Sequence, residues 1–376
     1  MNHPQPSATE TRTPAPSSAI PPAASADPVE DAADRAVGGD HTRSASTPGG
    51  RLALVGERAG SLWTLGVLLL IVAVFCVVVP NFHSKAAWVA TALAATEVLL
   101  LSLGQAFVVV GRGIDLSVGA TVGLSGIVSG WSMSRMLGGT DWSQPVILGV
   151  GALVAIGVGT GVGLVNGIVV TRLHITPLIA TLGMMGAATG ATELVNDGQD
   201  ISDLPPDIFR IGNTALLDGW LPIPVLIVAV VAVGAGVLLH RTRFGRHSYG
   251  IGSNPEASAR TGIRVARHTT TVYGLAGGLA GVAGYLVMAQ LASASVTAGR
   301  GSELSAVAAV VIGGISLFGG RGNIAGAIIG TLIITVLQTG LVVAGVSSSW
   351  QTIAVGVVLV AAVFADRQRL RLAGRT

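Results

Sequence analysis

Four ionisable side chains interrupt the long apolar stretches of this sequence: Glu97, Arg112, Asp115 and Glu193. Charged groups are costly inside a membrane, and where they occur they are commonly functional. Glu97 is expected deepest in its apolar segment, where it fits a proton site or a polar cavity equally well. Arg112 and Asp115 fit a local pair or polar turn as well as a solute contact, and Glu193 is expected near the end of its segment.

Neutral polar residues on the apolar segments form a second group of candidates. Their amide and hydroxyl groups suit hydrogen bonds to an uncharged, polyhydroxylated solute, and they equally suit hydrogen bonds between packed helices. Two of the acids, Glu97 and Asp115, join them as candidates. The residues that we expect along a translocation path are Glu97, Gln105, Asp115, Ser117, Asn166, Thr176 and Thr181.

Motifs for catalysis are missing from the sequence. It contains neither a GxxxxGK[ST] phosphate-binding loop nor an HExxH zinc motif. Its one cysteine, Cys76, excludes an intrachain disulfide and a cysteine-based metal cluster. We therefore expect no enzyme activity, cofactor or metal site on this chain. Uphill movement of a solute would need energy from an ion gradient or from a partner.

Composition identifies the class of protein. Half of the 376 residues are hydrophobic and 11% are charged, whereas soluble domains average about 25% charged residues. The 53 glycines suit closely packed membrane helices. The net charge is +3, and the arginines lie beside apolar segments. Their placement is explained more simply by the orientation of the chain in the membrane than by nucleic-acid binding. The sequence predicts an all-α polytopic membrane protein.

The apolar pattern predicts about ten membrane-spanning helices of about 20 residues each. The predicted spans are 62–79, 87–110, 116–137, 146–170, 177–195, 222–240, 269–290, 304–318, 323–345 and 350–365. Residues 1–50 are rich in Pro, Ala, Ser and Thr, so we expect a disordered cytoplasmic tail. Residues 51–368 then form the membrane domain, and 369–376 a short basic tail.

The distribution of arginine predicts that both termini are cytoplasmic. The connections on one side hold Arg112, Arg172, Arg321 and the six arginines of the segment 240–268. The long connection 196–221 on the other side carries five aspartates. Positive charge collects on the cytoplasmic side of membrane proteins, so an even number of spans is expected.

The segment 240–268 is too polar for the membrane and lies between two apolar segments. Within it, Asn254, Pro255 and Glu256 predict a helix start, because they suit the N-cap, the first helical position and the positive end of the helix dipole. Gly262 suits the residue just past the helix end. We expect a helix of about two turns, roughly 12 Å long, on a basic loop at the membrane face.

Two segments of the chain resemble each other. VVVGRGIDLSVGATVGLSG (108–126) and AVVIGGISLFGGRGNIAGAIIG (309–330) each join an apolar run to a Gly-rich helix through a Gly-containing break. The two copies have the same predicted orientation, which predicts a parallel repeat of five spans each, and broken helices line the path in many transporters. Chance similarity between two Gly-rich membrane segments is the alternative.

Several stretches carry a family resemblance: GRGIDLSVGATVGLSG (111–126), GLVNGIVVTRLHITPLIATLG (163–183), GSNPEASARTGI (252–263), YGLAGGLAGVAG (273–284), SELSAVAAVVIGGISLFGGRGNIAGAIIG (302–330) and GVSSSWQ (345–351). They resemble the permease subunits of bacterial ABC importers for ribose and related monosaccharides, a group that includes xylose, galactose and autoinducer-2 permeases. The similarity covers roughly residues 60–365.

This resemblance implies a dimeric channel for a monosaccharide, of two identical or two different permease chains, in the cytoplasmic membrane of a bacterium. It also implies a cytoplasmic ATPase that holds ATP and Mg²⁺, and an extracytoplasmic sugar-binding protein. The residues that it assigns to a coupling helix, which docks on the ATPase, are Asn254, Pro255, Glu256, Ala257, Arg260 and Gly262. Arg112 departs from the family pattern, where a smaller residue is usual, and the N-terminal tail is longer than expected.

Two other interpretations stay open. The chain fits a stand-alone ion-coupled carrier or facilitator, for which Glu97 would be the ion site. It also fits an ABC permease for a nucleoside or a branched-chain amino acid. A membrane scaffold without transport is disfavoured, because broken helices are typical of transport paths and a scaffold does not need them.

Overall fold

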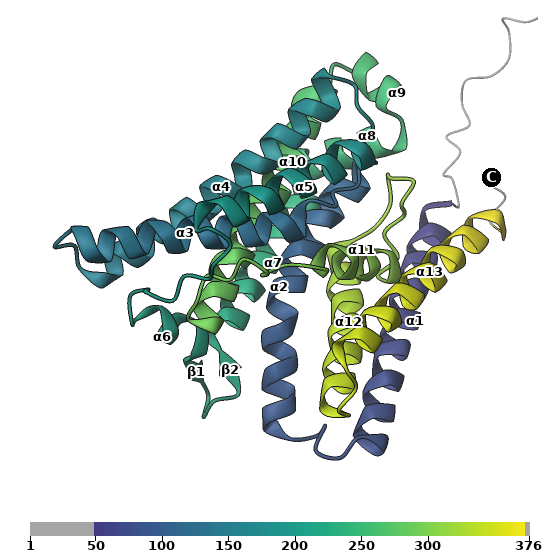
Figure 1. The fold of residues 1–376 in the computed structure, drawn as a ribbon. Coiled ribbons are helices and arrows are strands. Elements are labelled where there is room, and N and C mark those ends of the chain that lie inside the picture. Colours follow the sequence, from purple (N-terminus) through teal and green to yellow (C-terminus); the bar gives the residue numbers. More distant parts are fainter. Residues whose placement is uncertain (1–48, 373–376) are drawn as a thin grey trace, which may run out of the picture. The chain divides into compact units, whose positions relative to one another are not determined.

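The computed structural model describes residues 49–372, and it describes side chains from residue 63 to residue 364. The described part is almost entirely helical (Figure 1). Its helices are α1 (Gly49–Val78), α2 (Lys85–Val110), α3 (Val118–Gly139), α4 (Gln144–Arg172), α5 (Pro177–Val195), α6 (Ile208–Asn213), α7 (Ile223–Arg241), α8 (Arg243–Ser253), α9 (Pro255–Arg260), α10 (Val265–Leu291), α11 (Ser302–Ile312), α12 (Ile324–Val343) and α13 (Ser348–Leu372).

Each of the ten predicted spans overlaps one of these helices. Six of them, α2, α4, α5, α7, α10 and α12, are long and apolar enough to cross a membrane. The predicted all-α polytopic class is confirmed, whereas the number of ten spans and the repeat of five plus five stay predictions. Nearly all of the predicted tail 1–50 lies outside the described residues, and the basic tail 369–376 is described only to Leu372, where α13 ends.

Helix α11 is shorter than the predicted span 304–318. It has 11 residues, which give about 16 Å of helix at 1.5 Å per residue, against about 30 Å for the hydrocarbon core. The helix ends because Gly314 adopts a left-handed conformation, with φ +83°. The chain then runs through the non-helical segment 313–323 before α12 begins at Ile324.

Some short elements were not predicted. The acidic connection 196–221 contains α6 and most of a hairpin, in which β1 (Ala215–Leu216) pairs antiparallel with β2 (Leu221–Pro222). The segment 240–268 contains α8 in addition to the one helix expected there. The hairpin strands have two residues each, too few for an alternating pattern to be visible in the sequence.

Helix α2 is the centre of the packing. Every residue from Leu100 to Val110 is buried. Figure 1 shows α2 between two groups of helices, one made by α3, α4, α5 and α10 and the other by α11, α12, α13 and α1. It contacts α10 in the first group and both α11 and α12 in the second. Any relative movement of the two groups must therefore involve α2.

Helices α4 and α10 pack with their backbones almost touching. A methyl group on Gly159 of α4 would overlap the carbonyl oxygen of Gly277 on α10, and one on Gly163 would overlap that of Tyr273. Farther along α10, Gly281 lies in the same way against the carbonyl of Ala155. Small residues at four-residue spacing allow this close approach, which replaces the missing hydrophobic driving force between helices in lipid.

We predict that Gly159→Ala destabilises the protein and that Gly161→Ala on the same helix does not. A Cβ at Gly159 meets the α10 backbone, whereas one at Gly161 has nothing within 4 Å. Overpacking typically costs about 1–3 kcal/mol, while alanine at an unhindered helical site stabilises by up to about 1 kcal/mol. Thermal unfolding in detergent measures both, and equal midpoints for the two variants would contradict the close packing.

Candidate functional site

Helix α9 begins where the sequence predicts. The side-chain Oδ1 of Asn254 accepts a hydrogen bond of 3.0 Å from the backbone N–H of Ala257, and Pro255 is the first helical residue. The helix ends at Arg260 after six residues, about 9 Å at 1.5 Å per residue. The predicted start is confirmed, and the helix is shorter than the two turns expected.

The end of α9 is also closed as predicted. The N–H of Gly262 donates to the carbonyl of Ala259 (3.0 Å), and that of Ile263 donates to the carbonyl of Ser258 (3.2 Å). These two bonds make a Schellman motif, which needs a left-handed residue just past the helix end. Gly262 supplies it with φ +86°.

One face of α9 is open to solvent. Glu256, Ala257 and Arg260 are exposed, whereas Ser258 is buried and lies close to Gly250 of α8. Among the described residues, neither Glu256 nor Arg260 takes part in an ion pair. A rigid, capped turn with free charges of both signs is suited to contact a partner protein.

Helix α8 holds α9 in place. It starts at Thr242, whose hydroxyl accepts a hydrogen bond of 3.4 Å from the N–H of Gly245. The hydroxyl of Tyr249 donates to the carbonyl of Gly322 (2.6 Å), and Ser248 hydrogen-bonds to His268 of α10 (2.9 Å). Threonine is a favoured N-cap residue, so Thr242 could have indicated the start of α8. The glycines of α8 lower the helix propensity of the segment, and for this reason the helix was not predicted.

The end of α8 contacts the ends of two other segments. The N–H of Gly320 donates a hydrogen bond of 2.9 Å to the carbonyl of Val110, the last residue of α2. Gly252 packs directly over this pair, because a Cβ there would overlap the Val110 oxygen and lie 2.5 Å from the Gly320 nitrogen. We call Val110, Gly252 and Gly320 the backbone junction. It connects the α8–α9 segment to both helix breaks.

The first break follows α2 and runs from Gly111 to Ser117. Its first turn is a Schellman motif, in which Arg112 donates to the carbonyl of Val109 (2.9 Å) and Gly113 to that of Val108 (2.8 Å). Arg112 has φ +69°, a conformation that costs a non-glycine residue about 1–2 kcal/mol.

The second break, after α11, has the same turn. Gly314 donates to the carbonyl of Val311 (2.9 Å) and Ile315 to that of Val310 (3.0 Å). Gly314 therefore stands where Arg112 stands in the first break. This local match explains why a small residue is the easier choice at position 112, and it extends the sequence similarity between the two segments to their backbone geometry.

A buried polar cluster lies at the end of the first break. Asp115 Oδ1 accepts hydrogen bonds from the backbone N–H (2.9 Å) and the hydroxyl (2.7 Å) of Ser117. Asn166 of α4 donates to the Ser117 hydroxyl (2.8 Å), and all three residues are 1% exposed. The cluster joins the start of α3 to the last third of α4.

Two further side chains bind the same break through its backbone. The hydroxyl groups of Thr181 on α5 and Tyr273 on α10 lie 3.4 Å and 3.3 Å from the carbonyl oxygen of Ile114. Tyr273 was not predicted as a site residue, because a single tyrosine in an apolar helix gives no signal of its partner.

Comparisons with known proteins identify the family. The family described as "Branched-chain amino acid transport system / permease component" matches residues 88–363. The chain belongs to this permease family. It is 40% identical to the ribose import permease protein of Bacillus subtilis (strain 168), over 72% of this chain and 81% of the relative.

Other relatives have similar names. The chain is 35% identical to the ribose import permease protein of Escherichia coli (strain K12), over 81% of this chain and 93% of the relative. It is 33% identical to the D-allose transport system permease protein of Escherichia coli (strain K12), over 81% and 90%. No solved structure is a significant match. The resemblance to ribose-type ABC permeases is thereby confirmed.

The permease does not bring all the predicted path residues together. Asp115, Ser117, Asn166 and Thr181 gather around the first break, as described above. Gln105 is fully buried on α2, and neither its amide nitrogen nor its oxygen has a hydrogen-bond partner among the described residues. Thr176 is exposed at the start of α5. Four of the seven predicted path residues therefore form one cluster, and the other three are not part of it.

The acids of the permease are placed differently from one another. Glu97 is partly buried and accepts a hydrogen bond from the hydroxyl of Ser302 at the start of α11. Next to Ser302, Glu303 is also partly buried and lies against Gly119 of α3. Glu303 was not predicted as a site residue, because it lies at the edge of an apolar segment. Glu193 pairs with Arg300 at 3.2 Å and is half-exposed, as its place near a segment end predicted.

We predict opposite effects on stability at the two matching turns. Arg112→Gly should raise the free energy of unfolding, because glycine adopts a positive φ without the steric cost. Gly314→Ala should lower the free energy of unfolding by about 1 kcal/mol or more, because alanine adopts a positive φ only at a steric cost. No atom lies within 4 Å of the new methyl group, so the loss would come from the backbone alone. Thermal unfolding in detergent measures both, and a stabilising Gly314→Ala would contradict the assigned geometry.

Proposed function

We propose that this permease is the transmembrane subunit of an ABC importer that carries a monosaccharide, ribose or a similar sugar, into the cell. A separate ATPase would bind ATP and Mg²⁺ and supply the energy. A sugar-binding protein outside the membrane would deliver the solute to a dimer of permease chains. The family match and the relatives named for ribose and D-allose support this proposal.

The observation that carries the proposal is the exposed, doubly capped helix α9. Its open face offers Glu256 and Arg260, neither of which forms an ion pair with a described residue. The sequence contains no phosphate-binding loop, so energy from ATP would have to arrive through contact with another protein. Helix α9 is suited to be that contact and would act as the coupling helix, with Asn254, Pro255, Glu256, Ala257, Arg260 and Gly262 forming it.

The backbone junction gives this contact a route to the membrane. A displacement of α8 and α9 acts at Gly252, which packs without a side chain against Val110 and Gly320. Close-packed elements of this kind transmit strain, because no flexible side chain lies between them to absorb it. Movement of α9 by the ATPase would thus reach both helix breaks and, through α2, both groups of helices.

The proposed path runs along α2 and the first break. Gln105 and Ser102 are one turn apart on α2, fully buried, and without hydrogen-bond partners among the described residues. An unsatisfied buried polar group costs about 1–3 kcal/mol. A conformation that opens this region to water or to a sugar would recover that cost, so these residues favour opening at α2.

The proposed orientation places α8, α9 and both termini in the cytoplasm. It rests on the arginine distribution, and on the ATPase being cytoplasmic. In this orientation α6 and the hairpin of β1 and β2 face outward, where the binding protein would dock. The aspartates of the connection 196–221 then lie on the outer side.

We expect Gly262→Pro to abolish binding of the ATPase, and Gly262→Asn to preserve most of it. Proline fixes φ near −65° and cannot adopt the +86° of this position, whereas asparagine tolerates it. The measurement is co-purification of the ATPase with the tagged permease from gently solubilised membranes. Adding Glu256→Arg to Gly262→Asn should abolish binding again by reversing an exposed charge. Wild-type binding and uptake in Gly262→Pro, with normal membrane insertion, would count against the coupling role.

We expect Glu97→Gln to leave sugar uptake within about twofold of wild type. An ATP-driven importer needs no ion site in the membrane, and glutamine can still accept the hydrogen bond from Ser302. The measurement is uptake of labelled ribose at two external pH values. Loss of both uptake and its pH dependence would instead favour the ion-coupled carrier, in which a membrane acid binds the driving ion.

A further inference from the structure

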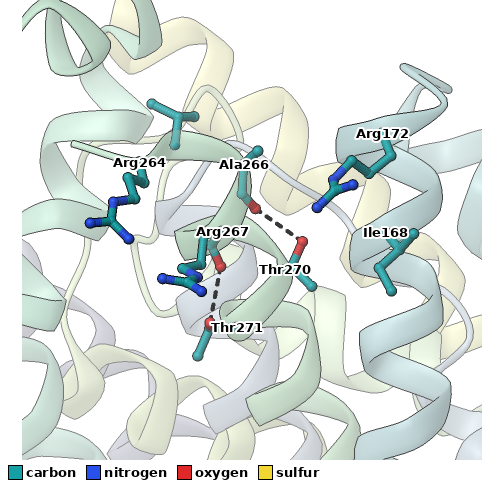
Figure 2. A pocket seen from close by; sticks show the side chains of 8 residues that line it. Ile168, Arg172, Arg264, Ala266, Arg267, Thr270 and Thr271 are labelled. Carbon is teal, nitrogen blue, oxygen red and sulfur yellow. Dashed lines mark hydrogen bonds between the residues drawn. The ribbon is translucent and has the colours of Figure 1, made fainter. Parts of the chain in front are cut away.

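Three arginines are among the residues that line a cavity of about 530 Å³ at one end of helices α4 and α10. Arg172 is the last residue of α4, and Arg264 and Arg267 flank the start of α10. Figure 2 shows Arg264 and Arg267 next to each other, with Arg172 extending from the α4 side. The hydroxyl groups of Thr270 and Thr271 are turned back onto their own helix, each bonded to the carbonyl four residues before (2.9 Å).

The charge of this cavity is not balanced within the described chain. None of the three arginines forms an ion pair with a described residue. Neither α4 nor α10 contains an aspartate or a glutamate. Three arginines therefore line one cavity with no described anionic side chain to pair with, and an external anion would complete the site.

An apolar groove continues from the cavity along the same two helices. It has a volume of about 440 Å³ and is lined by Ile156 and Leu164 of α4 and by Leu275 and Val282 of α10. Thr271 borders both the arginine cavity and the groove. Along α10 the groove reaches from Thr271 to Val282, about 16 Å at 1.5 Å per residue, which matches half of the 30 Å hydrocarbon core.

Glycines of α10 form the floor of the groove. A Cβ on Gly274 would lie 2.8 Å from Leu164, and one on Gly278 would lie 2.9 Å from the hydroxyl of Thr160. Because these positions carry no side chains, Leu164 and Thr160 of α4 pack directly over them, and the groove for a long thin ligand runs along the outside of the two helices. Leu164 and Ile156 are 39% and 38% exposed, so the α4 wall of the groove is open toward the surrounding membrane.

The geometry points to a binding site for an anionic phospholipid, with its phosphate among Arg172, Arg264 and Arg267 and one acyl chain in the groove. Basic pockets between membrane helices at the membrane surface are suited to anionic head groups. The apolar groove next to the cavity favours a lipid, because neither a free phosphate nor an acidic protein segment has an apolar chain to fill it. The inference rests on the membrane location of the chain and not on its solute.

The test is lipid binding by the delipidated, full-length permease, followed by native mass spectrometry. The probes are phosphatidylglycerol and phosphatidylcholine with the same acyl chains. The variant is Arg172→Gln with Arg264→Gln and Arg267→Gln. The matched control is Arg241→Gln with Arg243→Gln and Arg246→Gln, which removes the same charge from exposed positions nearby.

We expect phosphatidylglycerol to bind more tightly than phosphatidylcholine. Each arginine near the membrane surface contributes about fivefold in affinity, so the variant should lose on the order of 100-fold while the control stays near wild type. Thr271→Trp, at the join between cavity and groove, should weaken binding without removing charge, and Thr271→Ser should not. Glycerol phosphate should fail to compete.

Several results would overturn the proposal. Equal binding of the two lipids, or equal losses in the variant and the control, would show that charge acts without a site. Competition by glycerol phosphate with no effect of Thr271→Trp would assign the cavity to a free anion. A changed oligomeric mass in Thr271→Trp, or lost ATPase binding in the arginine variant, each with unchanged lipid binding, would assign the surface to a second copy or to the partner.

Discussion

The backbone contact at the carbonyl oxygen of Val110 holds together three segments that are far apart in the sequence. This oxygen belongs to the last carbonyl of α2, and a helix end in an apolar setting must find partners for its free carbonyl groups. Gly320 of the second break supplies one through a hydrogen bond of 2.9 Å. Gly252 packs over that bond. One backbone contact thus joins the central helix, the second break and the segment that carries α9.

Glycine makes this arrangement possible in two different ways. At Gly252, and between α4 and α10, it allows backbones to approach more closely than any side chain would permit. At Gly262 and Gly314 it allows a left-handed turn that ends a helix cleanly. The same residue therefore gives the bundle its tight packing and gives the breaks and the coupling helix defined ends. A membrane protein that must change shape without losing its packing needs both properties.

The sequence was informative where a signal is local. The cap of α9 depends on Asn254, Pro255 and Gly262, which lie within nine positions of one another, and its start and end are confirmed. The glycines of α8 lowered its helix propensity, so that helix was missed, and the length of α11 was overestimated because apolar residues continue past its end.

Contacts between distant segments could not be predicted. The backbone junction joins Val110 to two residues that are each more than 100 positions away along the chain, and nothing in the local sequence links Val110 to Gly252 or Gly320. Among the predicted path residues, Ser117 and Asn166 meet, while Thr176 is exposed at the start of a helix. Polarity in an apolar segment indicates that a residue matters but not which partner it meets.

We propose that this permease moves its solute with energy received through α9. Uptake of a labelled sugar into proteoliposomes tests it most directly, with the permease reconstituted alone or with the ATPase that co-purifies with it. We expect uptake that requires the ATPase, hydrolysable ATP and the sugar-binding protein, and no uptake by the permease alone. Uptake by the permease alone, driven by the sugar's own gradient or by a proton gradient, would contradict it.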